Sequence, residues 1–349
     1  MSPPRPISRR QLLLSLPALT IASKIRAQPT SIPPIPVRSF SHFVLKVADV
    51  QRSVDFYQGL FGLPVQARQG STVLLRVGPG PQYLGLTPAG SSPPAIGLFG
   101  LKVEGFNADR VMRALVERGM TKAEPGDPGP SGGALKARLV TRSGTPEIYI
   151  GDPDGLIAQL QDASYCGGSG PLGAVCRSLE PFSKKSLLAV RDMSHATIRV
   201  SDSQRTASFY QRLFGLQIQG HQGAAPFYGL GRGPQFLMFA GGGSGAAGRG
   251  RGAAVPAEPR IDHVCLSMTR FDPVEVTKAL NDYGIRSRET GSSVAGPLVT
   301  YVTLRMPERG GAPGGTPELY FTDPDGLLMQ LQDITYCGGS GFLGDVCTG

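Results

Sequence analysis

The sequence has no tryptophan, four histidines and five cysteines among its 349 residues. The scarcity of histidine leaves few candidate metal ligands or proton acceptors. Its longest largely apolar run, residues 12–21, is too short to span a bilayer as a mature helix. Hydrophobic residues make up 40%, and together with 48 glycines and 31 prolines they indicate folded, loop-rich domains rather than disorder. The length leaves room for two ordinary domains, each with its own core.

The N-terminus reads MSPPRPISRRQLLLSLPALTIASKIRAQP. The pair Arg9 and Arg10, followed by the apolar run and small residues, resembles a twin-arginine export signal. We expect residues 1–27 to be a signal peptide cleaved near Ala27, and residues 28–38 to be a linker. The mature protein is then periplasmic or otherwise exported, with no stable membrane span. A retained membrane anchor is the alternative.

Acidic residues are fewer than basic ones, and the formal net charge is +9. Residues 1–27 hold five basic and no acidic side chains, which leaves 30 against 26, or +4, for the rest. The remaining arginines are scattered, which favours an ordinary solvated surface and a small-molecule partner over a nucleic acid.

The cysteines form two similar pairs and one single residue. Cys166 and Cys176, like Cys337 and Cys347, are ten residues apart, and YCGGSG opens each pair. This predicts two local disulfides in an oxidising compartment, with Cys265 free and structural. A zinc site is the alternative, although the long glycine-rich spacing is unlike a knuckle of two to four residues.

An internal duplication runs through the sequence. SHFVLKVADVQRSVDFYQGLFGLPVQARQG from Ser41 recurs as SHATIRVSDSQRTASFYQRLFGLQIQGHQG from Ser194, and the TPE, DPDGL, QLQD and YCGGSG blocks follow in the same order. The second copy has extra loop residues, mostly in the glycine-rich run 241–254. The chain therefore consists of two homologous copies.

Each copy contains the same order of predicted elements. In the second copy one helix is expected between Asp202 as N-cap and Gly215 as stop, and another between Asp272 as N-cap and Gly284. A strand precedes each helix and short strands follow it. Each copy is therefore two βαβββ units.

FYQxLFGL and DPDG in this arrangement resemble the vicinal oxygen chelate superfamily, which includes glyoxalase I, bleomycin-resistance proteins and extradiol dioxygenases. The resemblance implies an α+β fold: a tandem repeat of two glyoxalase-like domains, each two βαβββ units forming an incomplete eight-stranded barrel around a central site. We expect domains at 39–176 and 191–349, joined by a linker at 177–190.

In that superfamily the metal ligands come from the first strand of each βαβββ unit and from the strand after DPDG. By this resemblance the ligand positions of the second copy are His195, His263 and Gln330. The first copy has His42 and Leu98 at the two histidine positions, so its metal site is expected to be incomplete. Gln330 is neutral where the family has a carboxylate, so it should hold a metal less tightly.

Glu318 is a second candidate for the third ligand. A three-residue hairpin loop from Asp323 to Gly326 pairs Tyr320 with Gln330 and sets Glu318 on the same face, diagonal to Gln330. The alternative is a hydrogen-bonded polar pair inside the barrel, because the pair recurs as Glu147 and Gln159 in the copy that lacks the second histidine.

Two residues are candidates for catalysis. Tyr320 matches a tyrosine that extradiol enzymes keep beside the metal, and the resemblance implies a hydrogen bond to a metal-bound substrate oxygen. Its recurrence as Tyr149 favours a packing role instead. His221 is the other histidine of the second copy and a possible proton acceptor, although it matches no catalytic histidine of the family.

Three functions compete. The first is an exported mononuclear metalloenzyme, an extradiol-like dioxygenase that uses Fe(II), with Mn, Ni or Zn as alternatives, on a small catechol-like compound. The second is a glyoxalase-like lyase or isomerase, which the absence of a fourth-strand glutamate, with Met238 in its place, disfavours. The third is a non-catalytic periplasmic binding or resistance protein. The oligomeric state is left open.

Overall fold

The computed structural model describes residues 33–182, 186–241, 258–289 and 296–347. The predicted signal peptide and most of the glycine-rich run lie outside these residues. All described residues belong to one compact unit that begins at Pro33. We call residues 33–182 the first half and residues 186–347 the second half.

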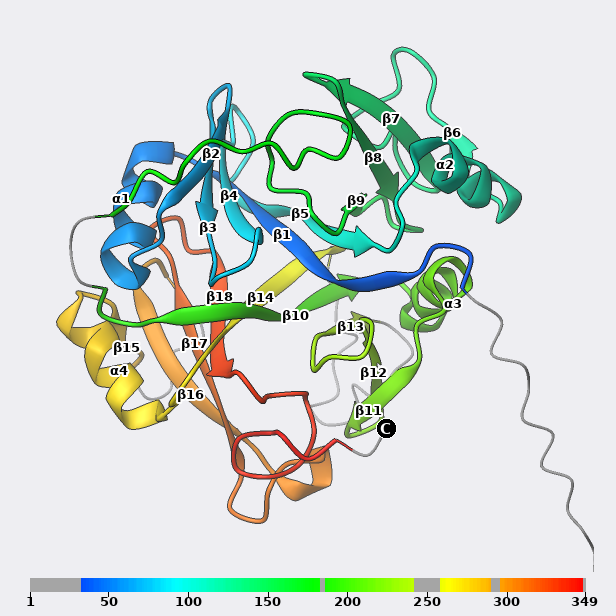
Figure 1. The fold of residues 1–349 in the computed structure, drawn as a ribbon. Coiled ribbons are helices and arrows are strands. Elements are labelled where there is room, and N and C mark those ends of the chain that lie inside the picture. Colours follow the sequence, from blue (N-terminus) through cyan, green and yellow to red (C-terminus); the bar gives the residue numbers. More distant parts are fainter. Residues whose placement is uncertain (1–32, 183–185, 242–257, 290–295, 348–349) are drawn as a thin grey trace, which may run out of the picture. The chain divides into compact units, whose positions relative to one another are not determined.

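The first half is one nine-stranded sheet with two helices (Figure 1). The helices are α1 (Val50–Phe61) and α2 (Ala108–Glu117). Its strands are β1 (Val37–Val47), β2 (Val65–Gln69), β3 (Thr72–Arg76), β4 (Tyr83–Pro88), β5 (Ala95–Val103), β6 (Thr121–Lys122), β7 (Lys136–Arg142), β8 (Thr145–Gly151) and β9 (Ile157–Asp162). The strand order is β2-β3-β4-β1-β5-β9-β8-β7-β6.

The second half repeats this course. Its helices are α3 (Ser203–Phe214) and α4 (Pro273–Asp282), with a short 3-10 helix η1 (Pro307–Arg309). Its strands are β10 (Val190–Val200), β11 (Ile218–Gln222), β12 (Ala225–Gly229), β13 (Phe236–Gly241), β14 (Arg260–Met268), β15 (Arg286–Ser287), β16 (Val299–Arg305), β17 (Thr316–Thr322) and β18 (Leu328–Asp333). The strand order β11-β12-β13-β10-β14-β18-β17-β16-β15 matches that of the first half.

The topology confirms two βαβββ units per half, with one difference from the expected eight strands. The first strands of the two units pair antiparallel, as β1 with β5 and β10 with β14. Each also pairs in parallel with the last strand of its own unit. The ninth strand of each sheet, β6 or β15, has only two residues. Because the first strands are central, alternate residues on them face the middle of each barrel.

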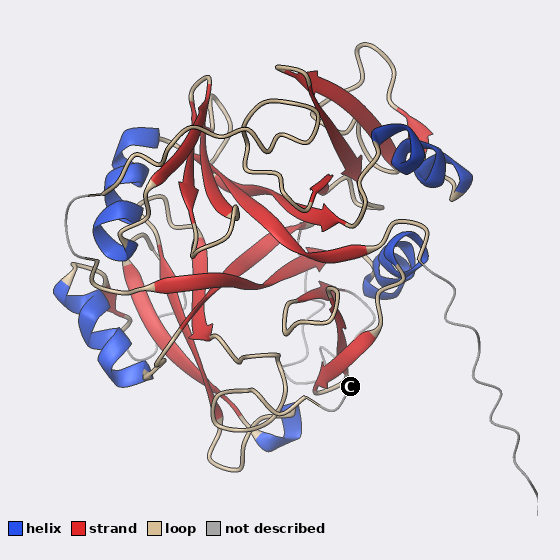
Figure 2. Cartoon of the chain, viewed as in Figure 1, coloured by secondary structure: helices blue, strands red, loops and turns tan. Residues whose placement is uncertain are grey.

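Local signals determine the helix ends. The Asp202 side chain accepts hydrogen bonds from two backbone amides of α3, and Gly215 ends that helix in the left-handed conformation with φ of 66°. Asp272 caps α4 in the same way, and this helix ends two residues before Gly284, at Asp282. The helices lie on the outside of the strands in Figure 2. The predicted positions of both helices are therefore confirmed.

Each half docks its first helix on the Asp-Pro-Asp-Gly turn of the other half. Arg52, in α1, forms an ion pair with Asp325. In α3, Arg205 forms an ion pair with Asp154 at 2.6 Å. The carboxylates of Asp325 and Asp154 are almost buried. The FYQxLFGL and DPDG motifs therefore meet across the boundary between the halves.

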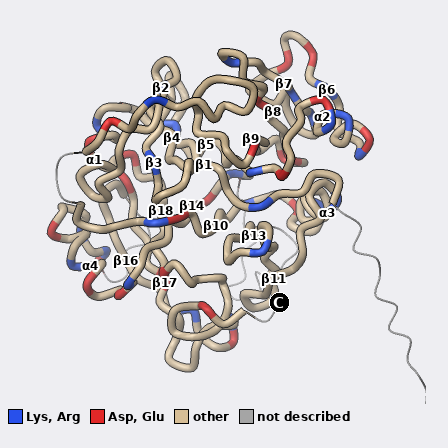
Figure 3. Tube along the Cα trace, in the orientation of Figure 1, with Lys and Arg blue, Asp and Glu red and all other residues tan. Residues whose placement is uncertain are grey.

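The predicted cysteine pairing is confirmed. Cys166 is bonded to Cys176 and Cys337 to Cys347, and Cys265 is free and buried. Two disulfides are consistent with an oxidising environment. No helix among the described residues is long and apolar enough to cross a membrane. Basic and acidic positions are interspersed over both halves in Figure 3.

Candidate metal site

Three neighbouring strands bring His195, His263 and Gln330 together. His195 lies on β10, His263 on β14 and Gln330 on β18, and β14 lies between the other two strands. The two imidazole rings are nearly perpendicular, with centroids 5.7 Å apart. His195 Nε2 is 2.9 Å from Gln330 Oε1.

His195 is almost fully buried, and it stacks on Phe236 with ring centroids 4.5 Å apart. Burial, followed by the nearby His263, holds the pKa of His195 well below its usual value. Its imidazole is therefore neutral at physiological pH, which is the form that binds a metal.

His263 has a carboxylate partner, Asp262. The Nδ1 of His263 is 3.0 Å from Asp262 Oδ2, and Arg199 donates to Asp262 Oδ1 at 2.5 Å. Burial alone would raise the pKa of Asp262, but the hydrogen bonds from His263 and Arg199 hold it well below its usual range. An ionised carboxylate that accepts a hydrogen bond from Nδ1 keeps the imidazole proton on that nitrogen. The lone pair of Nε2 is then free to bind a metal, as in many metal sites whose histidine ligands have a carboxylate partner. Asp262 was not predicted as a site residue, although it directly precedes His263 in the sequence.

Gln330 is the oxygen donor nearest His195. No group of three or more His, Cys, Asp or Glu side chains that could hold a metal occurs within the described ranges, so a metal here would need this amide. Two donors at right angles on one metal, each at about 2.1 Å, lie about 3 Å apart, which the His195–Gln330 distance of 2.9 Å matches. The amide nitrogen of Gln330 is buried without a hydrogen-bond partner in the described structure. Two imidazoles and one amide oxygen fit a single, weakly held divalent metal.

The structure gives Glu318 another partner. Arg305, which is fully buried, donates from Nε to Glu318 Oε1 at 2.8 Å. The hydroxyls of Tyr320 and Tyr336 donate to the same carboxylate, each at 3.3 Å. The charge of Glu318 is thus balanced by an ion pair next to the site, which disfavours Glu318 as a metal ligand. Arg305 was not predicted as a partner of Glu318. Its equivalent in the first half, Arg142, also ends the strand before the one that carries the glutamate, and this recurrence could have indicated the pair.

Tyr320 lies beside His263, with ring centroids 5.4 Å apart and planes at 90°. Tyr320 pairs with Gln330 across the hairpin, as predicted. Burial, then the charge of Glu318, raises the pKa of Tyr320 well above its usual value. The hydroxyl therefore keeps its proton and acts as a donor.

The structure does not bring His221 to this cluster. His221 is exposed on the edge strand β11. Its neighbour Gln222 reaches Tyr336 inside the barrel, with its amide nitrogen 3.3 Å from the hydroxyl. Successive side chains of a strand point to opposite faces, so His221 points outward. The predicted role of His221 as a proton acceptor at this site therefore has no support in the geometry.

The first half contains a similar arrangement, in which the residues that correspond to Asp262 and His263 differ and His42 stacks on Tyr83 where His195 stacks on Phe236. His42 Nε2 is 3.0 Å from Gln159 Oε1, and Glu147 pairs with Arg142 while accepting from Tyr149 at 2.9 Å. Leu98 occupies the place of His263, and Gly97 occupies that of Asp262. This half has one imidazole where the second half has two.

The fold and the site together define a class: tandem βαβββ proteins with candidate ligands on the two central first strands and on the strand after DPDG. The family model of the Glyoxalase/Bleomycin resistance protein/Dioxygenase superfamily matches residues 39–160 and 192–331. The chain belongs to this superfamily. No curated protein sequence matches it.

Solved structures of similar fold include both dioxygenases and a glyoxalase. A catechol 2,3-dioxygenase is 16% identical, with 88% of each chain covered and a TM-score of 0.56. Homoprotocatechuate 2,3-dioxygenase from Brevibacterium fuscum, in complex with 3,4-dihydroxyphenylacetate, is 15% identical, with 87% of this chain and 83% of that chain covered and a TM-score of 0.55. The Mn(II)-bound glyoxalase from Novosphingobium aromaticivorans is 14% identical, with 90% and 93% covered and a TM-score of 0.53. At these identities the likeness shows the fold alone.

Proposed function

We propose that the second half is a mononuclear metal centre in which His195, His263 and Gln330 hold one divalent metal, with Fe(II) as the first choice and Mn, Ni or Zn as alternatives. The observation that supports this most strongly is the Asp262–His263 pair, at 3.0 Å, in the half that also has His195. The first half lacks both members of the pair but keeps the histidine–glutamine contact and the buried arginine–glutamate pair. An arrangement that served only the packing of the barrel would not need the carboxylate.

The proposed reaction is the oxygen-dependent cleavage of a small catechol-like compound. The bound metal would act as a Lewis acid that chelates two adjacent substrate oxygens and leaves room for O2. Tyr320 would donate its retained proton to a substrate oxygen beside His263. Asp262 would keep the His263 ring oriented through Nδ1.

Metal content tests the proposal. We expect one metal per purified chain, retention in His42→Ala and loss in His263→Ala, because only His263 is a ligand. Gln330→Ala should weaken binding, whereas Glu318→Gln should leave stoichiometry unchanged because Glu318 is bound by Arg305. Near-ultraviolet circular dichroism of each variant controls for folding. Two metals per chain, or equal loss in the two histidine variants, would refute the proposal.

Turnover of a catechol panel by the iron-loaded protein tests the reaction. Coloured ring-cleavage products should form with the unchanged protein and fall sharply with Tyr320→Phe. Turnover of a hemithioacetal with nickel or zinc would instead assign a glyoxalase-like reaction.

A periplasmic binding protein is the second candidate. The engagement of Glu318 by Arg305 favours it, because this leaves no carboxylate among the ligands. His221 points outward, so His195 and His263 are the only described histidines inside this barrel. Both are proposed metal ligands, so no further histidine is left there as a proton acceptor. Tight binding of a small aromatic compound without metal or turnover would support this candidate.

We also propose that the protein is exported. The two disulfides are consistent with an oxidising compartment. The Arg9–Arg10 pair suits export of an already folded protein. Replacing both arginines by lysine should abolish periplasmic accumulation, and unchanged accumulation would contradict this route.

A further inference from the structure

A cleft of about 490 Å³ lies between the two halves. It is lined by matching segments: residues 94–97 and 155–157 from the first half, and residues 259–262 and 326–328 from the second. Most of these side chains are apolar, including Ile96, Leu156, Ile261 and Leu327. A volume of this size accommodates a small organic molecule.

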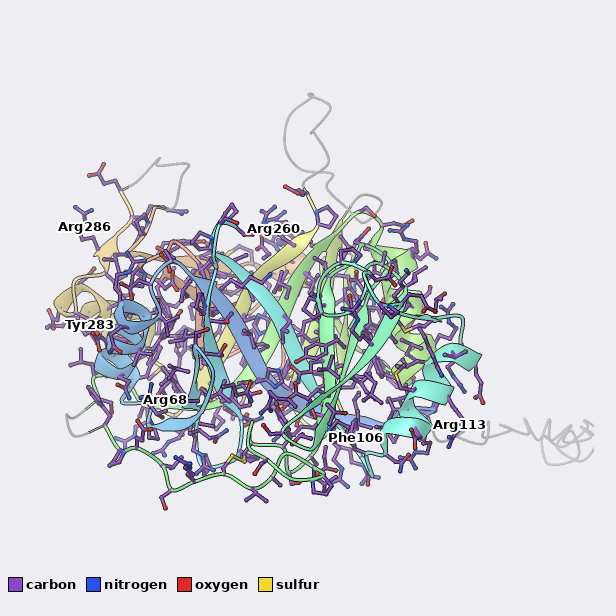
Figure 4. The ribbon with its side chains drawn as sticks, turned by 90° about the horizontal axis from the view of Figure 1, so that it is seen from above. Arg68, Phe106, Arg113, Arg260, Tyr283 and Arg286 are labelled. Atoms are coloured by element: carbon purple, nitrogen blue, oxygen red, sulfur yellow. A yellow bond between two sulfur atoms is a disulfide. The ribbon has the colours of Figure 1, made fainter. Side chains whose placement is uncertain are left out.

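The charged residues of the cleft are Lys46, Arg260 and Asp262. Asp262 is already neutralised, because Arg199 and Arg260 both contact its Oδ1, at 2.5 Å and 3.4 Å. Arg260, labelled in Figure 4, lies at the start of β14 and is half exposed. Within the described ranges, Lys46 has no ion-pair partner. The cleft thus has an excess of positive charge.

The duplication explains why Lys46 is unpaired. In the strand register, Lys46 on β1 lies opposite Ala95 on β5, and Arg199 on β10 lies opposite Arg260 on β14. Lys46 and Arg199 therefore occupy equivalent positions in the two halves. Arg199 has Asp262 as its partner, but the equivalent residue in the first half is Gly97. A Cβ built on Gly97 would lie 3.1 Å from Cε of Lys46, so the ammonium stem crosses the space where a carboxylate would be.

We propose that this cleft is a second ligand site, which binds a small organic anion with an apolar body, such as an aromatic carboxylate. The anionic group would pair with the ammonium of Lys46 and supply the countercharge that the first half lacks, with Arg260 as a second cation at the rim. The apolar lining would cover the rest of the ligand. Ionic contacts in a partly buried, apolar setting are screened less than on an open surface. The ligand therefore needs both a charge and an apolar body.

Benzoate is the probe, with benzyl alcohol as its neutral counterpart. Saturation-transfer NMR on the mature chain, after treatment with a chelator, should show benzoate bound about tenfold more tightly than benzyl alcohol, because only the carboxylate of benzoate pairs with Lys46. Lys46→Met should weaken benzoate binding by the same factor. Lys278→Met, which removes an equal charge from the exposed surface of α4, should leave it unchanged.

Gly97→Asp supplies the missing carboxylate and provides a second variant. It should abolish benzoate binding, because the introduced group pairs with Lys46 and fills the space. The cleft and the candidate metal site share Asp262, so the two are separated with His263→Ala, which should still bind benzoate. Loss of binding in His263→Ala with full binding in Lys46→Met would place benzoate in the barrel and overturn the proposal. Equal binding of benzoate and benzyl alcohol would also overturn it.

Discussion

The two halves have the same course of strands, yet they differ at two adjacent positions that matter for chemistry. Both keep a histidine–glutamine contact, of 3.0 Å in the first half and 2.9 Å in the second. Both keep a buried glutamate paired with an arginine and two tyrosines. Asp262 and His263 occur in the second half alone, against Gly97 and Leu98. The recurring network alone therefore does not distinguish the halves, and the two positions that differ indicate where a function specific to the second half resides.

Transferring the differing pair should have the largest effect. The double variant Gly97→Asp, Leu98→His gives the first half a second imidazole with a carboxylate on its Nδ1 side, next to His42 and Gln159. We expect the metal content to rise from one to two per chain, measured by elemental analysis and native mass spectrometry. Leu98→His alone is the matched control and should bind the second metal more weakly, about tenfold or more, because its ring is not oriented by a carboxylate. A double variant that still binds one metal would show that the difference between the halves lies elsewhere.

The two arginine–glutamate pairs differ in the burial of the arginine. We therefore expect replacement of the two arginines to lower the free energy of unfolding by unequal amounts. Arg305 is fully buried and also donates to the carbonyls of Gly310 and Gly339, at 2.8 Å and 2.9 Å, whereas the Arg142 side chain is 28% exposed. Both glutamates are buried, so the difference lies in the arginines. Arg305→Met should lower the free energy of unfolding by about 3 to 5 kcal/mol, because it leaves a buried carboxylate and two backbone carbonyls without their donor in a site that water does not reach. Arg142→Met should cost about 1 to 2 kcal/mol.

Urea unfolding measures both costs. Arg305→Met combined with Glu318→Gln should recover part of the loss, because no uncompensated charge remains. Equal costs for the two arginines would contradict the effect of burial.

The buried histidines predict how stability depends on pH. Burial lowers the pKa of His42 to about 3, below its value of about 6.5 in the unfolded chain. The unfolded state then binds more protons between these values, so stability falls as the pH drops, by up to about 1.4 kcal/mol per pH unit for one such group. His42→Gln removes this term. Its destabilisation should therefore shrink as the pH falls from 6.5, and a constant difference from the unchanged protein would refute the assignment.

Asp152 and Asp323 act in the opposite direction. Burial raises the pKa of each to about 6, so the folded state binds more protons than the unfolded state between about 4 and 6. Their contribution to stability rises as the pH falls through this window. The matched variants Asp152→Asn and Asp323→Asn should therefore isolate the histidine term in the unfolding measurements.

The smallest effect is expected where the halves are most alike. Arg52 and Arg205 are half exposed and pair with almost buried carboxylates on the opposite half. Each change to alanine should cost about 1 kcal/mol, and the two costs should be equal and additive because the contacts are separate. Added salt should reduce both. Unequal costs would show that the boundary between the halves is less symmetric than its contacts.

Much of the fold follows from the sequence alone, because short-range rules determine it. Asp202 and Gly215 are correct ends of a helix since they satisfy local backbone groups. The turn at Asp323 establishes the pairing of Tyr320 with Gln330, because the length of a hairpin loop determines its register. The cysteine spacing was enough for the disulfides. The repeated blocks and their family resemblance extended these local results to the whole topology.

The partners of the buried charges required the tertiary structure. Glu318 could be predicted to face the barrel, but its pairing with Arg305 is made across two adjacent strands, and the spacing of the residues along the chain does not show it. His221 could be named but not oriented, since it lies on an edge strand with an irregular register. Lys46 and Asp262 line one cleft because the strands of two distant copies meet there, and no rule of spacing along the chain determines which side chains two different sheets bring together.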